Sequence, residues 1–217
     1  MKRWLRDNRG FLLFALCFAF LRTAMADWNP IPSGSMRPTI LEGDVVLVNR
    51  LAYDFKVPLT DLSLATTGEP QRGDVITFSS PRDGTRLIKR LVGLPGDVIE
   101  LRDERLLVNG VPAEYSNAAD VTEPRGPAIR ATERLGSRAH AVQFLPVVPA
   151  PRSFGPVRVP QGHYFFLGDN RDDSADSRYI GFVPRHLLIG RAHHILVSAE
   201  ITGNWLPRLS RFGQPIE

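Results

Sequence analysis

The sequence has very little cysteine: its single thiol is Cys17, inside an apolar segment. One cysteine excludes a disulfide framework and a cysteine-based zinc site within one chain. A dense basic run is also missing, although the chain has 27 Lys and Arg against 23 Asp and Glu. Since no recognition-helix pattern and no mixing of aromatic with basic residues accompanies this mild excess, we expect no nucleic-acid partner.

A long hydrophobic run is lacking as well, because the N-terminal apolar stretch extends only from Phe11 to Leu21. A membrane-spanning helix needs about 20 apolar residues, whereas the core of a cleaved signal peptide has about 7 to 15. Ala24-Met25-Ala26 follows with the small-x-small pattern of a cleavage site. The segment is therefore either a retained anchor or a cleaved signal peptide.

Two tryptophans favour retention. A helix between Trp4 and Trp28 would be about 36 Å long, enough for the hydrocarbon core and both interfaces of a bilayer. We expect an uncleaved transmembrane anchor over residues 10–27. The positively charged residues 1–9 then stay in the cytoplasm and the rest of the chain is exported.

The remaining chain has the pattern of a mainly β fold. Three segments repeat a Gly-Asp turn followed by a β-rich run: EGDVVLV from Glu42, RGDVITF from Arg72 and PGDVIEL from Pro95. Asn109-Gly110 stands between two apolar runs, which is a strong signal for a β-hairpin. No region after residue 30 shows a long helical period.

A change of composition predicts an inserted segment. Seven prolines fall between Val121 and Pro160, with few sustained apolar alternations. We expect residues 103–160 to form a small, loop-rich β subdomain. Residues 28–102 and 161–217 would then form the β core.

The stretch WNPIPSGSMRPTI contains two candidate nucleophiles, Ser33 and Ser35, with no histidine nearby. A serine hydroxyl needs a base to remove its proton and donors to stabilise the oxyanion that forms. Pro32 and Pro38 stiffen the backbone around Ser35, and Gly34 allows close approach of a substrate backbone. Alone, Ser-Gly-Ser is also ordinary loop sequence.

Lys89 is a candidate base because its neighbours in TRLIKRLVG are apolar. A strand lysine normally points to water. If Lys89 faces an apolar pocket instead, desolvation favours the neutral amine, which can accept a proton. Arg90 should then point to the opposite face of the strand.

The third stretch, GDNRDDSADSRYIGFVP at residues 168–184, is rich in acidic residues. The spacing excludes a calcium loop, since Arg171, Ser174 and Ile180 occupy the third, sixth and twelfth positions counted from Asp169. A polar network, with no metal, fits better than a solvated loop. Its predicted members are Asp169, Arg171, Ser174, Asp176 and Arg178.

Taken together, PSGSM.PT, IKR.VGLPGD and GDNRD.S.DSR resemble the bacterial type I signal peptidases of the S26 family. The resemblance extends from about Arg22 to Arg191. It implies an antiparallel β-sheet catalytic core behind one N-terminal transmembrane helix. It also implies a serine endopeptidase that cleaves signal peptides from exported preproteins after small residues (Ala-X-Ala), through a Ser-Lys dyad and an acyl-enzyme.

The resemblance implies a role for each residue at a matching motif position, and it implies no cofactor. Ser35 would be the nucleophile, Lys89 the general base and Ser33 a side-chain donor to the oxyanion. Ser174 would orient Lys89, and the other members of the polar network would support that wall of the site. The candidate substrate-binding residues are Ile31, Pro32, Met36, Ile40, Leu87 and Ile88. Asp173 departs from the family, which usually has asparagine there.

The resemblance places the protein in the bacterial inner membrane as a single-pass protein, with the catalytic domain on the periplasmic face. Its expected partners are signal peptides, the lipid bilayer and, nearby, the secretion translocon. A dedicated pilin- or conjugation-system processing protease of the same family remains an alternative, as does a non-catalytic, peptide-binding β-domain. A Ser-His-Asp hydrolase fits less well, because none of the five histidines lies in a triad motif.

Overall fold

The three Gly-Asp turns open three strands in the computed structural model, as predicted: β2 (Asp44–Asn49), β5 (Val75–Ser79) and β7 (Val98–Arg102). The glycines have φ angles of 84°, 90° and 90°, which a side chain disfavours. Each aspartate carboxylate accepts a hydrogen bond from the backbone N–H three residues earlier, at 2.8, 2.9 and 2.6 Å. In these turns the glycine therefore adopts the positive φ angle, and the aspartate side chain closes the turn with a hydrogen bond.

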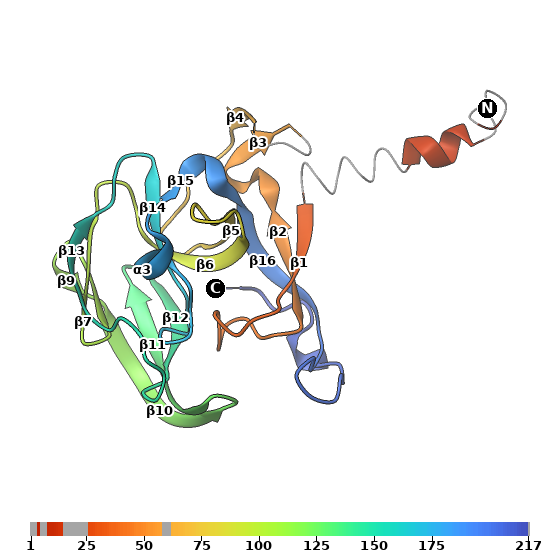
Figure 1. Ribbon diagram of the computed structural model, residues 1–217. Helices are drawn as coiled ribbons and strands as arrows, with labels where there is room; N and C mark the ends of the chain where they lie inside the picture. Colours follow the sequence, from red (N-terminus) through yellow and green to blue (C-terminus); the bar gives the residue numbers. More distant parts are fainter. Residues whose placement is uncertain (1–3, 5–7, 15–25, 58–61, 217) are drawn as a thin grey trace.

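The structure describes residues 4, 8–14, 26–57 and 62–216 (Figure 1). The largest sheet has seven strands in the order β1-β2-β16-β5-β6-β14-β15. Besides β2 and β5, its strands are β1 (Ala26–Pro30), β6 (Arg86–Gly93), β14 (His163–Leu167), β15 (Val183–Pro184) and β16 (Leu188–Ser198). The pairings between these described strands are all antiparallel.

Three smaller sheets complete the fold. Their strands are β10 (Glu114–Glu123), β11 (Gly126–Leu135) and β12 (Arg138–Phe144); β13 (Phe154–Arg158), β7, β8 (Arg105–Val108) and β9 (Val111–Pro112); and β3 (Asp54–Lys56) with β4 (Ser63–Thr66). The helices are short: η1 (Arg50–Ala52), α3 (Ser177–Ile180), η2 (Arg185–Leu187) and η3 (Leu209–Arg211). The described residues thus form the mainly β, antiparallel fold that the sequence predicts.

The predicted hairpin is confirmed. Asn109 and Gly110 connect β8 to β9 with φ angles of 55° and 79°, and Val108 pairs with Val111. Positive φ at both turn residues matches the right-handed twist of the strands.

The predicted loop-rich segment is different in the structure. Residues 114–144 consist almost entirely of the strands β10, β11 and β12, seen in green in Figure 1. Most residues of β10 are exposed, so the strand lacks the apolar alternation by which a half-buried strand is recognised. The predicted boundary after residue 102 also passes through a sheet, because β7 pairs with both β8 and β13. The division into core and insertion stays a prediction.

The predicted anchor lies mostly outside the described residues. Residues 9–14 are helical, and residues 15–25 are not described. Among the described residues, no helix is long and apolar enough to cross a membrane.

The seven-stranded sheet curls so that two distant strands meet. β1 is the end strand and β6 is the fifth in the order, yet a side chain of β6 hydrogen-bonds to β1: Arg86 donates to Asn29 at 2.8 Å. We call the boundary between residues 27–30 of β1 and residues 86–89 of β6 the strand seam. The segment that follows β1 carries Ser35, and β6 carries Lys89.

Candidate active site

The loop that carries Ser35 is anchored to the hydrophobic core by apolar side chains. Met36 and Ile40 are 0% exposed and pack with Ile31 against β2. The chain is closed at its base by a hydrogen bond from the backbone N–H of Gly43 to the carbonyl of Ile31, at 2.9 Å. These contacts hold Ser35 in one position above the core.

Lys89 meets Ser35 across a separation of 54 residues in sequence. Its Nζ lies 2.7 Å from Oγ of Ser35 and 2.9 Å from the carbonyl oxygen of Ile88. Only 3% of Lys89 is exposed. Burial lowers the pKa of Lys89 to about 8, although the negative charges of Asp176 and Asp169 partly oppose this shift. Much of the lysine is therefore neutral near pH 8 and able to accept the serine proton.

The third sequence motif holds the serine loop from the other side. The backbone N–H of Asn170 donates to the carbonyl of Ser35 at 3.2 Å, and its side-chain amide donates to the carbonyl of Gly34 at 3.0 Å. Thr39 donates its hydroxyl proton to Asp169 at 2.5 Å. The sequence reading missed Asn170 and Thr39, although both lie inside the motifs that it singled out.

Asp169 has a different partner from the one expected within its own segment. Arg90 forms two hydrogen bonds with its carboxylate, both 2.8 Å, and both side chains are buried. Burial alone would raise the pKa of Asp169, but the charge and hydrogen bonds of Arg90 more than reverse this, so the pKa is lowered. The pair ties the third motif to the strand that carries Lys89.

Arg171 keeps a contact within its own segment, because its Nε donates to the carbonyl of Gly168 at 3.1 Å, and its Nη2 reaches out to Glu133 of β11 at 2.5 Å. His140 of β12 lies 3.3 Å from Glu133 and 3.9 Å from Asp169. Burial raises the pKa of Glu133, but Arg171 and His140 outweigh it and hold the pKa well below its usual range. Burial and nearby Arg90 lower the pKa of His140. The sheet β10–β12 is thus connected to the site by buried charges.

Asp176 and Arg178 do pair with each other as predicted, through two hydrogen bonds of 2.8 Å. Asp176 also accepts the backbone N–H of Gly168 at 3.0 Å and caps α3 through the N–H of Arg178. One carboxylate therefore fixes both ends of the 168–178 segment.

Ser174 does not make the expected hydrogen bond to Lys89. It is buried, and its hydroxyl has no partner among the described residues. A Cβ on Gly168 would overlap with the side chain of Ser174 and with the carbonyl oxygen of Ser35. Ser174 is thus packed against Gly168, within the wall of the same cavity as the dyad.

A cavity of about 560 Å³ opens over Ser35 and Lys89. Its other lining residues are Ser33, Gly34, Arg82, Leu87, Val148, Pro149, Asp172, Asp173, Ser174, Ala175 and Tyr179. Leu87 is the one residue of the expected substrate-binding set among them. Val148, Pro149 and Tyr179 are apolar or aromatic walls that the sequence reading missed.

The rest of that set lies elsewhere. Ile31, Met36 and Ile40 are buried in the core, Ile88 packs against the same cluster, and Pro32 is exposed. This corrects the expectation that Met36 and Ile40 form pocket walls. An apolar side chain beside a catalytic motif can either line a pocket or anchor the loop, and the sequence pattern is the same for both.

Two residues that line the cavity, Ser33 and Ser35, each have a hydrogen-bond donor without a partner among the described residues. The hydroxyl of Ser33 and the backbone N–H of Ser35 make no hydrogen bond to any residue that the structure describes. Donors placed beside a nucleophile can stabilise an oxyanion. The arrangement therefore offers a nucleophile, a base and candidate oxyanion donors for acyl transfer.

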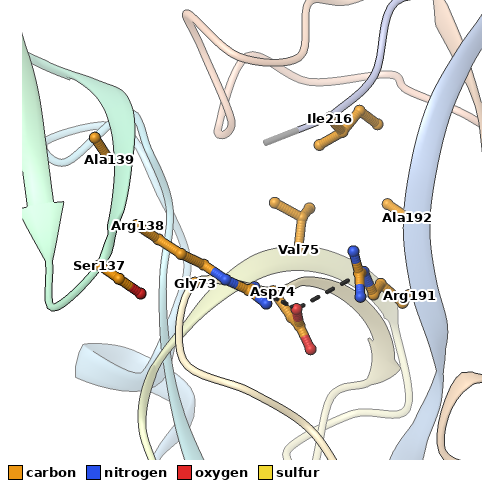
Figure 2. Close-up of a pocket in the computed structure, with 9 residues that line it drawn as sticks. All are labelled: Gly73, Asp74, Val75, Ser137, Arg138, Ala139, Arg191, Ala192 and Ile216. Carbon is orange, nitrogen blue, oxygen red and sulfur yellow. Dashed lines mark hydrogen bonds and ion pairs between the residues drawn. The ribbon is translucent and has the colours of Figure 1, made fainter.

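A second cavity, of about 380 Å³, lies between β5, β12 and β16 and contains none of these groups. Figure 2 shows Arg138 and Arg191 directed at Asp74 from two sides. Arg138 lies 2.6 Å and Arg191 3.7 Å from this carboxylate, which also accepts the hydroxyl proton of Tyr53 at 2.9 Å. The shared carboxylate links three strands of the fold.

Comparisons with known proteins agree on one family. A family model described as signal peptidase, peptidase S26, matches residues 1–197. Signal peptidase I of Pseudomonas fluorescens is 38% identical over 206 residues, covering 89% of this chain and 72% of the relative. Signal peptidase I of Rickettsia prowazekii is 35% identical over 216 residues, covering 91% and 82%. A crystal structure of a signal peptidase I from Enterococcus faecalis, 37% identical, covers 57% of this chain and 96% of that one, with a TM-score of 0.36.

Proposed function

Because the chain belongs to the S26 signal peptidase family, it is a serine peptidase that removes signal peptides from preproteins, and we propose that Ser35 and Lys89 are its catalytic dyad. The observation that carries this proposal is the 2.7 Å distance between Oγ of Ser35 and Nζ of a buried lysine. No histidine lines the cavity that contains the two groups.

In the proposed reaction, neutral Lys89 takes the proton of Ser35 as its oxygen attacks the scissile carbonyl carbon. The protonated lysine then returns this proton to the leaving amine, and an ester between Ser35 and the signal peptide remains. Water, deprotonated by the same lysine, attacks the ester; the lysine then gives this proton to Oγ of Ser35 as the signal peptide leaves. The lowered pKa of Lys89 supports both transfers, because it places the pKa near the working pH.

We assign the oxyanion hole to the hydroxyl of Ser33 and the backbone N–H of Ser35. The supporting roles go to the residues that fix the two segments: Asp169, Arg171, Asp176 and Arg178. We assign Ser174 to the cavity wall beside the dyad, because it lines the same cavity as Lys89.

The substrate is proposed to lie extended along the strand seam, with its scissile bond at Ser35. A β-strand edge binds an extended peptide through main-chain hydrogen bonds, while alternate side chains enter pockets. The walls at Leu87, Val148 and Pro149 would enclose a small side chain next to the scissile bond. Ala-X-Ala substrates fit this arrangement.

We propose that residues 10–27 anchor the enzyme in the bacterial inner membrane, with the catalytic domain on the outer face. Ser35 follows the anchor closely in sequence, so the site would lie near the bilayer surface and near the translocon from which signal peptides emerge. Exposed apolar residues of the C-terminal segment, among them Trp205, Leu206 and Leu209, are available for contact with lipid.

The decisive experiment is incubation of detergent-extracted wild type, Ser35→Ala and Lys89→Ala with a preprotein, followed by sequencing of the product. We expect a cut after Ala-X-Ala by the wild type and none by either variant. Ser116→Ala, on the exposed strand β10, is the matched control and should cut normally. Activity in Lys89→Ala would disprove the dyad. A panel of unrelated preproteins separates a general peptidase, which cuts most of them, from a dedicated processing protease.

A further inference from the structure

Arg86 closes the strand seam at the end away from Ser35. Its Nη1 donates to Oδ1 of Asn29 at 2.8 Å and to Oδ2 of Asp27 at 3.1 Å, while half of the side chain remains exposed. Arg50 lies 3.7 Å from the same carboxylate. Arg86 and Arg50 thus both approach the carboxylate of Asp27 at this end of the seam.

Asn29 brings an unsatisfied donor to the same place. Its residue is only 8% exposed, and its side-chain Nδ2 has no hydrogen-bond partner among the described residues. A buried amide donor without a partner is costly, and native proteins keep such groups where a ligand or water satisfies them. Together with the remaining N–H groups of Arg86, it makes a site that is rich in donors.

The strand edges on both sides of this site are open. Residues 86–89 of β6 pair with β5 on one side, whereas β14 pairs only from Arg90 onward. β1 ends the sheet and pairs only with β2. An extended peptide could therefore pair with either edge along the seam.

The direction of such a peptide follows from the two ends of the seam. Asp27 and Asn29 lie next to the proposed anchor, and Ser35 lies at the other end. The apolar part of a signal peptide stays at the membrane, so residues near Arg86 must precede the scissile bond. Arg86 is three residues before Lys89, or roughly 10 Å along a strand. With position −1 of the substrate beside Lys89, the contact of Arg86 therefore lies at about position −4.

Resting on the proposed function, we propose that Arg86 and Asn29 form a polar subsite that selects preproteins with a hydrogen-bond acceptor side chain at about position −4, next to the small residue at −3. The Arg86 bridge opens when the peptide enters, and the acceptor replaces Asn29 and Asp27 as its partner. The same acceptor takes the unused proton of the Asn29 amide. Because Arg86 is a cation, aspartate binds at least as well as asparagine.

The test is a substrate series with Leu, Asn and Asp, which are similar in shape, placed in turn at positions −2 to −6 of a preprotein. With the wild type we expect kcat/KM to be about tenfold higher for Asn and Asp than for Leu at position −4. Arg86→Met should remove this difference. Arg102→Met is the control, because Arg102 is an exposed arginine of β7 paired with Glu100, and should preserve it.

Asn29→Leu provides a second variant in case Arg86→Met fails to fold. It removes a buried donor without a partner, so the fold should persist, and the preference should fall. Equal cleavage of all substrates by the wild type, or an unchanged preference in Arg86→Met, would overturn the subsite. Neither result affects the proposed function, which fails only if cleavage of the parent preprotein does not need Ser35 and Lys89.

Discussion

Lys89 illustrates what burial does to a single residue. The amine that needs to be neutral for catalysis is the one with 3% exposure and a pKa lowered to about 8. We predict that kcat/KM rises about tenfold per pH unit below pH 8 and levels off above it, since only neutral lysine accepts the serine proton. A pH–rate profile with a soluble peptide checks this, and a flat profile from pH 6 to 9 would contradict it.

Lys89→Arg should be inactive in the same cleavage assay, because a guanidinium does not deprotonate.

The same residue should limit stability. In the unfolded chain a lysine has a pKa of about 10.5, so between pH 8 and 10.5 the unfolded state binds the proton and the folded state does not. Stability therefore rises with pH across that window, and below it burial costs about 3 kcal/mol. We predict that Lys89→Met raises the free energy of unfolding at pH 7 by about 2–3 kcal/mol while it abolishes cleavage. Urea denaturation of the wild type and the variant at pH 7 and pH 10 measures the stability change, and a cleavage assay measures the activity. A loss of stability at pH 7 would contradict a destabilising cost of burying the lysine charge.

For single residues, the sequence predicted which side chains are catalytic better than it predicted which neighbours they contact. Ser35 and Lys89 were predictable, because both lie in specific motifs, and the structure places them in hydrogen-bond contact. Ser174 and Met36 were less predictable. Whether a hydroxyl is bonded or an apolar side chain faces core or cavity depends on neighbours far away in sequence.

Among the contacts between elements, the buried ion pair of Arg90 and Asp169 connects the two segments that form the site. It joins β6 to the segment that clamps the serine loop. We predict that Asp169→Asn destabilises the fold by about 3–5 kcal/mol, because it leaves Arg90 buried without a counter-charge. Adding Arg90→Met should recover at least half of this loss in urea denaturation.

The exposed pair of Arg125 and Asp173 is the control for that cycle. Replacing Asp173 with asparagine, the residue usual in the family, should change stability by less than about 1 kcal/mol. If Asp169→Asn is equally mild, the buried pair does not hold the motif in place.

Elements that begin with a recognisable turn were predictable. The Gly-Asp turns and the Asn109-Gly110 hairpin depend on local backbone chemistry, so the sequence contains what determines them. The strands β10 to β12 were expected only as part of a loop-rich β subdomain. β10 is mostly exposed, and β11 and β12 bury polar residues such as Glu133 and His140, so none of the three shows a clear apolar alternation. The partners of Asp169 and Arg171 were also missed, since β6 and β11 supply them from far away in sequence.

For the whole molecule, the proposed anchor makes a separable contribution. We predict that a chain of residues 26–217, which keeps all of β1, melts at the temperature of the full chain and still cleaves a soluble peptide. Alkaline carbonate should release it from membranes, whereas the full chain stays in the pellet. Release of the full chain would contradict a spanning segment.

The sequence pattern did not predict how the seven-stranded sheet curls. Alternation identifies strands, but strand order depends on pairings such as β2 with β16, whose residues are far apart in the chain. Without that order, nothing indicated that Asn29 and Arg86 would meet.

The first strand also has a consequence for the life of the enzyme. β1 begins at Ala26, so the bond between Ala26 and Asp27, directly after the small-x-small triplet, lies inside a paired strand: Ala26 faces Asn49 and Asp27 faces Val48. A scissile bond must reach the nucleophile as a free extended segment, and here β1 would first have to detach from β2 and from Arg86. Pairing of β1 in the folded enzyme therefore opposes self-cleavage at this bond.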